Sequence, residues 1–159
     1  MAGALPSSTE RVRRALEASG LPLEIIEFPT STRTAQEAAD AIGCTVGQIV
    51  KSLVFRGETS GEAIMVLASG SNRVDLALLA QAAGEKPGKA DADFVRAETG
   101  FAIGGVAPVG HVKGLRIFID ETLRAHPVLW AAAGKPNAVF RLTPGDLARL
   151  AGGTFIRVC

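Results

Sequence analysis

The chain has 159 residues, enough for one domain to bury its own core, so we expect a single domain over residues 1–159. Hydrophobic residues make up 47% and charged residues 21%, a balance typical of globular rather than disordered proteins. The net charge of +1 excludes global basicity, so any nucleic-acid ligand would have to be held by a local patch.

The N-terminal part of the chain alternates helix and strand signals. Residues 7–10 read Ser-Ser-Thr-Glu, a capping box, and predict a helix that ends at Gly20. A β-rich run follows at 23–28 and predicts a strand. Residues 34–37 read Thr-Ala-Gln-Glu, a second capping box, and predict an alanine-rich helix that ends at Gly43.

The middle of the chain predicts a hairpin, two helices and a loop. The β-rich runs 49–55 and 63–68 flank a short Gly/Ser turn, which favours an antiparallel hairpin. Helices are predicted at 76–83 and 94–99, each with an aspartate available as N-cap. Residues 104–110 hold three glycines and a proline, too many for the interior of a helix or strand, and predict a loop with special backbone angles.

The C-terminal part continues this mixture. A strand is predicted at 116–120, a strand pair at 128–132 and 138–142, and a closing strand at 155–158. Residues 143–146 begin the last helix, with a proline at its first position. Helices mixed with hairpin-paired strands indicate the α+β class with a mixed or antiparallel sheet.

Metal sites, disulfides and membrane segments are not expected. The cysteines, Cys44 and Cys159, and the histidines, His111 and His126, lack the spacing of metal ligands or of a disulfide framework. The first residues contain no apolar signal-peptide core, and no apolar run reaches the length of a membrane span. We therefore expect a soluble cytoplasmic protein with no cofactor and no membrane partner.

Lys51 is the most informative single residue, because it interrupts the otherwise apolar run 49–55. A lysine on a half-buried strand costs free energy unless its ammonium group reaches solvent or a partner. Two interpretations remain open. Lys51 either lies on a solvated face of the strand or directs its ammonium group into a cleft, where it would hold a phosphate or carbonyl oxygen.

The loop at 104–110 is the second candidate. Glycines allow the backbone to approach a ligand and to point successive N–H groups into a concavity, and Pro108 would stiffen such a loop. A concavity of this kind binds an anion or a developing oxyanion without any side chain. A plain tight connection is the alternative interpretation of the same residues.

Other catalytic patterns are weak. The sequence has no nucleophile elbow, phosphate-binding loop or dinucleotide fingerprint, and neither histidine has an evident Ser or Cys partner. The paired acids at 91/93 and 120/121 are interpreted as helix caps, and Cys44 as part of the buried structure. The residues alone therefore leave one lysine and one backbone-rich loop as candidates.

Several segments together resemble the YbaK/ProX family, over roughly Thr34 to Gly152. These segments are TAQEAA at 34–39, VGQIVKSLVF at 46–55, GGVAPVG at 104–110, IDE at 119–121, AAG at 132–134 and LTPGDL at 142–147. The resemblance implies an α+β fold in which a curved, mixed, barrel-like sheet is flanked by helices. It also implies a relation to the editing insertion of bacterial prolyl-tRNA synthetases.

The same resemblance implies a trans-editing deacylase that hydrolyses the ester of mischarged tRNA, such as alanine or cysteine on proline tRNA. Its partners would be aminoacyl-tRNA and a synthetase, and it would be a monomer or a weak homodimer. Attack would come from a hydroxyl of the terminal ribose or a water, with backbone N–H groups stabilising the oxyanion. The catalytic residues carried over are Lys51, Gly104, Gly105, Val106, Ala107 and Pro108.

A second site that admits only small side chains would explain why such an enzyme is needed, because one methylene group is worth only about 1–3 kcal/mol of discrimination in a synthetase pocket. The strand at 49–55 is expected to form one wall of this editing pocket. The other expected substrate-binding residues are Thr30, Ser31, Ser69, Asn72 and Gly134.

Two other functions remain open. A non-catalytic module that binds the tRNA acceptor end or assists a synthetase would use the same lysine and loop, but would release no amino acid. A nucleotide- or DNA-binding protein would show a steep salt dependence of affinity, and the near-neutral charge weighs against it.

Overall fold

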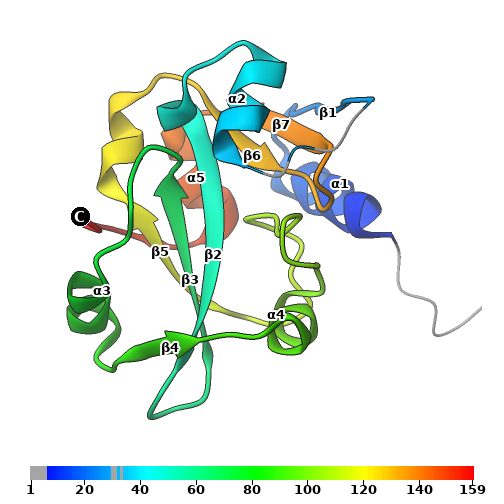
Figure 1. Cartoon of the computed structure of the whole chain (residues 1–159). Helices are drawn as coiled ribbons and strands as arrows, with labels where there is room; N and C mark the ends of the chain where they lie inside the picture. The colour runs from blue at the N-terminus through cyan, green and yellow to red at the C-terminus, as the bar shows by residue number, and fades with distance from the viewer. Residues whose placement is uncertain (1–6, 30–31, 33) are drawn as a thin grey trace, which may run out of the picture.

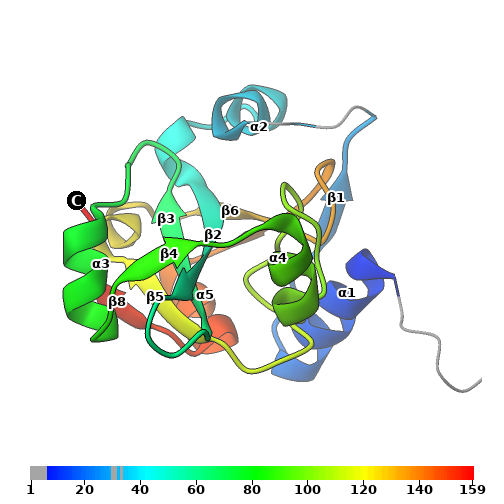
Figure 2. The ribbon, with the colours of Figure 1, turned by 60° about the horizontal axis from the view of Figure 1, so that its bottom comes forward.

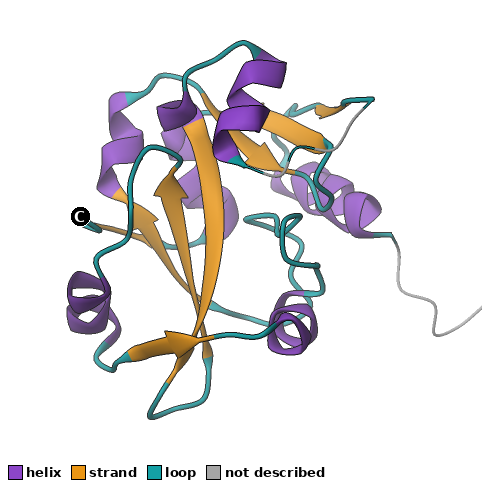
Figure 3. Ribbon diagram, in the orientation of Figure 1, coloured by secondary structure: helices purple, strands orange, loops and turns teal. Residues whose placement is uncertain are grey.

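The computed structural model describes residues 7–29, 32 and 34–159. Within that part of the chain, five α-helices surround an eight-stranded sheet (Figures 1 and 3). The helices are α1 (Ser8–Ser19), α2 (Ala35–Ile42), α3 (Leu76–Ala83), α4 (Ala92–Thr99) and α5 (Pro144–Ala151). The strands are β1 (Ile25–Glu27), β2 (Ile49–Gly57), β3 (Ala63–Ser69), β4 (Pro87–Lys89), β5 (Arg116–Asp120), β6 (Leu129–Ala132), β7 (Ala138–Leu142) and β8 (Thr154–Ile156). Two short 3₁₀ helices, η1 (Val46–Gln48) and η2 (Glu121–Ala125), precede β2 and follow β5.

The predicted helix caps are confirmed. Ser7 Oγ accepts a hydrogen bond from the Glu10 amide at 3.2 Å, and Thr34 Oγ1 accepts one from the Glu37 amide at 3.0 Å. Aspartates cap α3 and α4, and Thr143 caps α5. Each α-helix ends at a glycine in the left-handed conformation, which only glycine adopts at little cost.

The sheet runs in the order β1-β7-β6-β2-β3-β5-β8, with β4 paired to β2 off this path. The predicted hairpin is confirmed as the antiparallel pair β2–β3, and the predicted strand pair as the antiparallel pair β6–β7. Parallel pairing joins β2 to β6, β3 to β5 and β5 to β8. The α+β class with a mixed sheet is therefore confirmed, but the sheet stays open, because β1 and β8 form its two ends without pairing to each other.

Helices pack on both faces of the sheet (Figure 2). The larger core joins Val12 and Leu16 of α1 and Leu147 of α5 to one set of alternate strand residues. On the other face, Leu79 of α3 packs against alternate residues of β3. A third cluster joins the alanines of α2 to Ile49 and Trp130. None of the described helices is long and apolar enough to cross a membrane.

The sequence did not predict β4 or η2. Strand β4 is only Pro-Gly-Lys, residue types that local preference assigns to turns, and it forms because β2 offers it a partner edge. The 3₁₀ helix η2 begins where Asp120 accepts a hydrogen bond from the Thr122 amide at 2.9 Å, which agrees with the interpretation of this acid as a cap.

Glu85, between α3 and β4, forms hydrogen bonds to the β2–β3 turn and an ion pair with Arg116 of β5. Its carboxylate accepts hydrogen bonds from the Ser60 amide at 2.9 Å, the Ser60 hydroxyl at 2.7 Å and the Thr59 amide at 3.0 Å, and it contacts Arg116. The Ser60 amide and hydroxyl, aided by Arg116 and Thr59, lower the pKa of Glu85 from 4.5 to about 2.

We predict that Glu85→Gln lowers the thermal midpoint at pH 7. Because the pKa is lowered in the folded state, the contribution of the carboxylate is present above pH 4.5 and is lost as the pH falls towards 2. The difference in thermal midpoint between wild type and variant should therefore decrease over that pH range, as measured by thermal unfolding followed by circular dichroism. Glu17→Gln, at an exposed position on α1, is the control. A difference in thermal midpoint between wild type and Glu85→Gln that does not depend on pH would contradict the prediction.

Candidate functional site

The pairing of β2 is interrupted along one edge. One edge pairs with β3 over its whole length, from Val50–Ser69 to Arg56–Ala63. The other edge pairs with β6 only at 49–50 and with β4 only at 55–57. Residues 51–54 therefore have no partner strand on that edge among the described residues.

The register fixes which backbone groups face this gap. In the hairpin, the Gly70 amide donates to the Ile49 carbonyl at 2.7 Å, and the Gly57 amide donates to the Glu62 carbonyl at 2.9 Å. Alternate residues of an antiparallel strand direct both backbone groups to the same side, so odd-numbered residues of β2 face β3. Ser52 and Val54 consequently direct their N–H and C=O groups towards the open edge.

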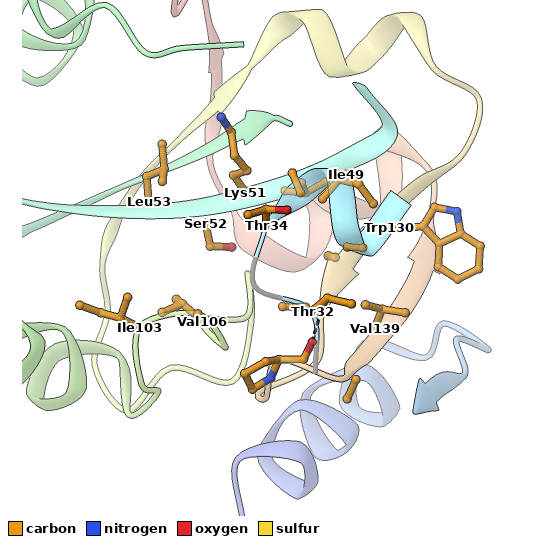
Figure 4. Close-up of a pocket in the computed structure, with 18 residues that line it drawn as sticks. Thr32, Thr34, Ile49, Lys51, Ser52, Leu53, Ile103, Val106, Trp130 and Val139 are labelled. Atoms are coloured by element: carbon orange, nitrogen blue, oxygen red, sulfur yellow. Dashed lines mark hydrogen bonds between the residues drawn. The ribbon is translucent and has the colours of Figure 1, made fainter. Parts of the chain in front are cut away.

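A cavity of about 350 Å³ lies at this open edge (Figure 4). Its walls come from the start of α2, from β2, from the loop at 103–106 and from β6 and β7. The lining is mostly apolar, with polar side chains from Thr32, Thr34, Lys51 and Ser52. The other lining residues are Ala35, Ala38, Ile49, Val50, Leu53, Ile103, Gly104, Val106, Trp130, Ala131, Ala132, Pro136, Ala138 and Val139.

Lys51 is one of the residues that line this cavity. Its Nζ donates to the Asn72 carbonyl at 2.7 Å, in the turn after β3. Figure 4 shows Lys51 and Ser52 leaving β2 on opposite sides, as the twofold alternation of a strand requires. The ammonium group of Lys51 is therefore held by the Asn72 carbonyl, on the side of β2 opposite Ser52.

A buried carboxylate organises the turn that holds Lys51. Asp120 is fully buried, and its Oδ2 accepts hydrogen bonds from the Asn72 side chain at 2.8 Å and the Ser69 amide at 3.0 Å. The Ser69 hydroxyl donates to the Gly47 carbonyl at 2.7 Å. A buried carboxylate is tolerated when donors surround it, so Asp120 fixes the turn and, through Asn72, the position of the Lys51 ammonium group.

The glycine loop lies on the other side of the cavity. The Gly105 amide donates to the Ala102 carbonyl at 3.0 Å, so this N–H is already occupied. No carbonyl among the described residues accepts a hydrogen bond from the Val106 amide. Gly104 has φ 94°, a conformation that favours glycine, and a Cβ on Gly105 would lie 2.9 Å from Lys135 Cα. The loop therefore packs directly against the β6–β7 turn.

Helix α1 supports this loop from behind. The Arg11 guanidinium lies 4.8 Å from the ring centroid of Phe101 and donates to the Gly100 carbonyl. A Cβ on Gly110 would lie 3.1 Å from the Arg11 carbonyl oxygen, and one on Gly134 would lie 2.7 Å from the Ser8 carbonyl carbon. These close backbone approaches hold the loop and the β6–β7 turn against α1.

His111 fixes the far end of the loop. Its Nε2 lies 2.7 Å from the Ala107 carbonyl, so the Nε2–H tautomer donates this hydrogen bond. The ring also meets Phe101 edge to face, with centroids 6.0 Å apart. Burial lowers the pKa of His111 below 6.5, and the Ala107 carbonyl opposes this effect.

The structure brings together part of the expected site. Lys51, Gly104 and Val106 line the cavity, whereas Gly105, Ala107 and Pro108 are buried in the same loop behind it. The expected binding residues are more scattered. Ser69 and Asn72 contribute to the turn that holds Lys51, Gly134 lies behind Gly105, and Thr30 and Ser31 lie outside the described residues.

Several lining residues were not expected from the sequence. Thr34 was recognised only as a helix cap, and Ile103 and Trp130 carried no signal of their own. Ser52 belongs to the strand at 49–55, which was expected to form one wall of the pocket, and residues 49–53 of this strand line the cavity. The described residues contain no group of three or more His, Cys, Asp and Glu side chains arranged to hold a metal ion.

Comparison with known proteins gives a consistent result. The family model described as the aminoacyl-tRNA editing domain matches residues 30–150. YwhH of Bacillus subtilis is 33% identical over 86% of this chain and 87% of its own. EbsC of Enterococcus faecalis, whose name proposes a Cys-tRNA(Pro)/Cys-tRNA(Cys) deacylase, is 28% identical over 91% of this chain and 90% of its own.

A solved structure shares the fold closely. It is described as that of a proposed trans-editing enzyme for prolyl tRNA synthetase. It superposes with a TM-score of 0.90 at 49% identity, covering 98% of each chain. This chain is therefore similar over nearly its whole length to a protein described in those terms.

We predict that Gly105→Ala lowers the free energy of unfolding by about 1–3 kcal/mol, because the new methyl group meets backbone atoms that cannot move aside. Chemical denaturation measures this change. Gly114→Ala is the matched control, since a Cβ there has no neighbour within 4 Å. Equal stability of Gly105→Ala and wild type would show that the loop is not packed against the β6–β7 turn.

A second prediction concerns pH. Because the pKa of His111 is lowered in the folded state, the unfolded chain binds more protons, and stability should fall as the pH drops below 6.5. His111→Gln should remove this component, so the variant loses less stability than wild type between pH 7 and pH 5 in denaturant titrations. His126→Gln is the control, and identical pH profiles for wild type and His111→Gln would refute the assignment.

Proposed function

The chain belongs to the family of aminoacyl-tRNA editing domains, and on that premise we propose that it is a trans-acting deacylase of mischarged tRNA. The observation that carries the proposal is the convergence of three features on one small cavity. These features are the open edge of β2, the glycine loop with its Val106 amide, and Lys51, which belongs to the lining and directs its ammonium group to the Asn72 turn.

The proposed reaction is hydrolysis of the ester between the amino acid and the terminal ribose. Water, or a ribose hydroxyl followed by water, adds to the ester carbonyl, and the bond between the carbonyl carbon and the ribose oxygen breaks. The products are the free amino acid and tRNA with both ribose hydroxyl groups restored. An ester of this kind is activated, so positioning and charge stabilisation supply most of the catalysis.

Each part of the site has a role in this proposal. The Val106 amide donates to the developing oxyanion, because the Gly105 amide is already bound to Ala102. The Lys51 ammonium group, held by the Asn72 carbonyl, contacts the terminal adenosine or the ester region. Lys51 is the one charged side chain in the described lining, which suits a substrate whose body is a polyanion.

The size of the cavity supports a small amino acid. At about 350 Å³ it lies at the lower end of ligand pockets, and its apolar walls suit a short aliphatic or thiol side chain. We therefore propose alanine or cysteine on proline tRNA as the substrate, a cytoplasmic location, and a prolyl-tRNA synthetase as the enzyme whose errors it corrects. The names of EbsC and of the similar solved structure support the same assignment.

We predict that Lys51→Ala lowers the deacylation rate by about 10²–10³-fold, the usual cost of removing one group that stabilises transition-state charge. The assay is release of labelled amino acid from proline tRNA charged in turn with alanine, cysteine, serine or proline. Lys86→Ala is the matched control, because this lysine side chain is 79% exposed, pairs with Glu58 at the surface and is not part of the cavity lining.

The outcomes separate the enzyme from a binding module. Rapid release of one small amino acid by wild type and by Lys86→Ala, with slow release by Lys51→Ala, supports the deacylase. Protection of the ester by wild type, with release no faster than in buffer, would instead indicate a protein that binds the tRNA acceptor end without catalysis.

A further inference from the structure

Ser52 carries a buried hydroxyl group without a partner. Its Oγ is shielded from solvent and has no hydrogen-bond partner among the described residues, although Ser52 lines the cavity. Figure 4 shows this side chain on the side of β2 where Val106 and Thr32 lie. An unpaired buried hydroxyl destabilises the folded state, so such a group is retained most readily where a ligand supplies the missing partner.

The backbone of Ser52 is open in the same region. Ser52 lies in the unpaired stretch of β2 between the segments that bind β6 and β4. Its register directs its N–H and C=O groups away from β3 and towards the open edge. One residue therefore offers a carbonyl, an amide and a hydroxyl to whatever occupies the cavity.

The lining decides which acceptors are available to a bound ammonium group. No aspartate or glutamate belongs to the described lining, so a bound ammonium group would find no carboxylate and must rely on neutral acceptors. A carbonyl and a hydroxyl oxygen are such acceptors, and an ammonium group has three donors to place. The positive charge of Lys51 lies on the opposite side of β2 and disfavours a second cation on its own side.

We propose that Ser52 binds the α-ammonium group of the aminoacyl moiety through its carbonyl and hydroxyl oxygens. This inference rests on the proposed deacylase function and names the residue that recognises the substrate as an amino acid. The ester carbonyl is attached to the carbon that bears the ammonium group, so anchoring that group at Ser52 orients the carbonyl for the Val106 amide. Ser52 is thus a specificity-determining residue for amino-acid esters over simple acyl esters.

The test compares two esters of the same tRNA, one of alanine and one of propionate, which has hydrogen in place of the ammonium group. Each enzymatic rate is divided by the uncatalysed hydrolysis rate of the same ester, because the ammonium group also activates the carbonyl. Wild type should favour the alanyl ester by about ten- to hundredfold, as expected for hydrogen bonds to a charged group.

Variants of Ser52 then locate the preference. Ser52→Ala should reduce kcat/KM for the alanyl ester about tenfold and reduce that for the propionyl ester much less, because one acceptor for the ammonium group is lost. Ser52→Thr keeps a hydroxyl on a side chain suited to a strand and should retain the preference. Ser19→Ala is the matched control, since the Ser19 hydroxyl donates to the Leu16 carbonyl in α1 and has no part in the cavity.

The possible failures are distinguishable. If wild type hydrolyses both esters with equal acceleration, or if Ser52→Ala slows both equally, the role of Ser52 is wrong while the deacylase function stands. The wild-type comparison gives this answer even if Ser52→Ala does not fold. If wild type accelerates neither the alanyl ester nor any other aminoacyl ester, the deacylase function itself is refuted, and the inference falls with it.

Discussion

The interruption in the pairing of β2 is the constraint on which the rest of the site depends. Backbone polar groups inside a sheet are normally satisfied by neighbouring strands, and β2 satisfies them along its whole inner edge through β3. On the outer edge, β6 and β4 pair with the two ends of β2 and leave 51–54 open between them. The cavity lies at this opening, and α2, the glycine loop and the β6–β7 strands form its remaining walls.

Because side chains alternate along a strand, the adjacent residues Lys51 and Ser52 direct their polar groups to opposite sides of β2. Lys51 directs a cation to one side, where Asn72 and the buried Asp120 hold it by a chain of hydrogen bonds. Ser52 directs a neutral hydroxyl to the other side, next to the glycine loop. A substrate lying across the edge of β2 would therefore meet a positive charge on one side and neutral acceptors on the other. Rigid strand geometry, rather than a mobile loop, keeps these groups apart.

Sequence reasoning was most successful where the signal is local. The helices were recognised from caps such as Ser7 and Thr34, and the β2–β3 hairpin from two β-rich runs around a short turn. Lys51 was recognised because a charge inside an apolar run is unusual. The gap in β2 was not recognisable, because it depends on where β4 and β6 pair, and these partners are distant in the chain. A serine such as Ser52 is unremarkable in a strand until the sheet edge beside it is known.

Helix α1 lies outside the residues that the family model matches, but it packs against the loops that form the site. The family match covers 30–150, yet Ser8 and Arg11 of α1 lie against the backbone of Gly134 and Gly110, and Arg11 stacks on Phe101. Val12 and Leu16 of the same helix are also part of the main core. A fragment cut to the matched range would retain every residue that lines the cavity, but would lose the support behind the glycine loop. The shortest segment that can hold the site in shape is therefore longer than the segment by which the family is recognised.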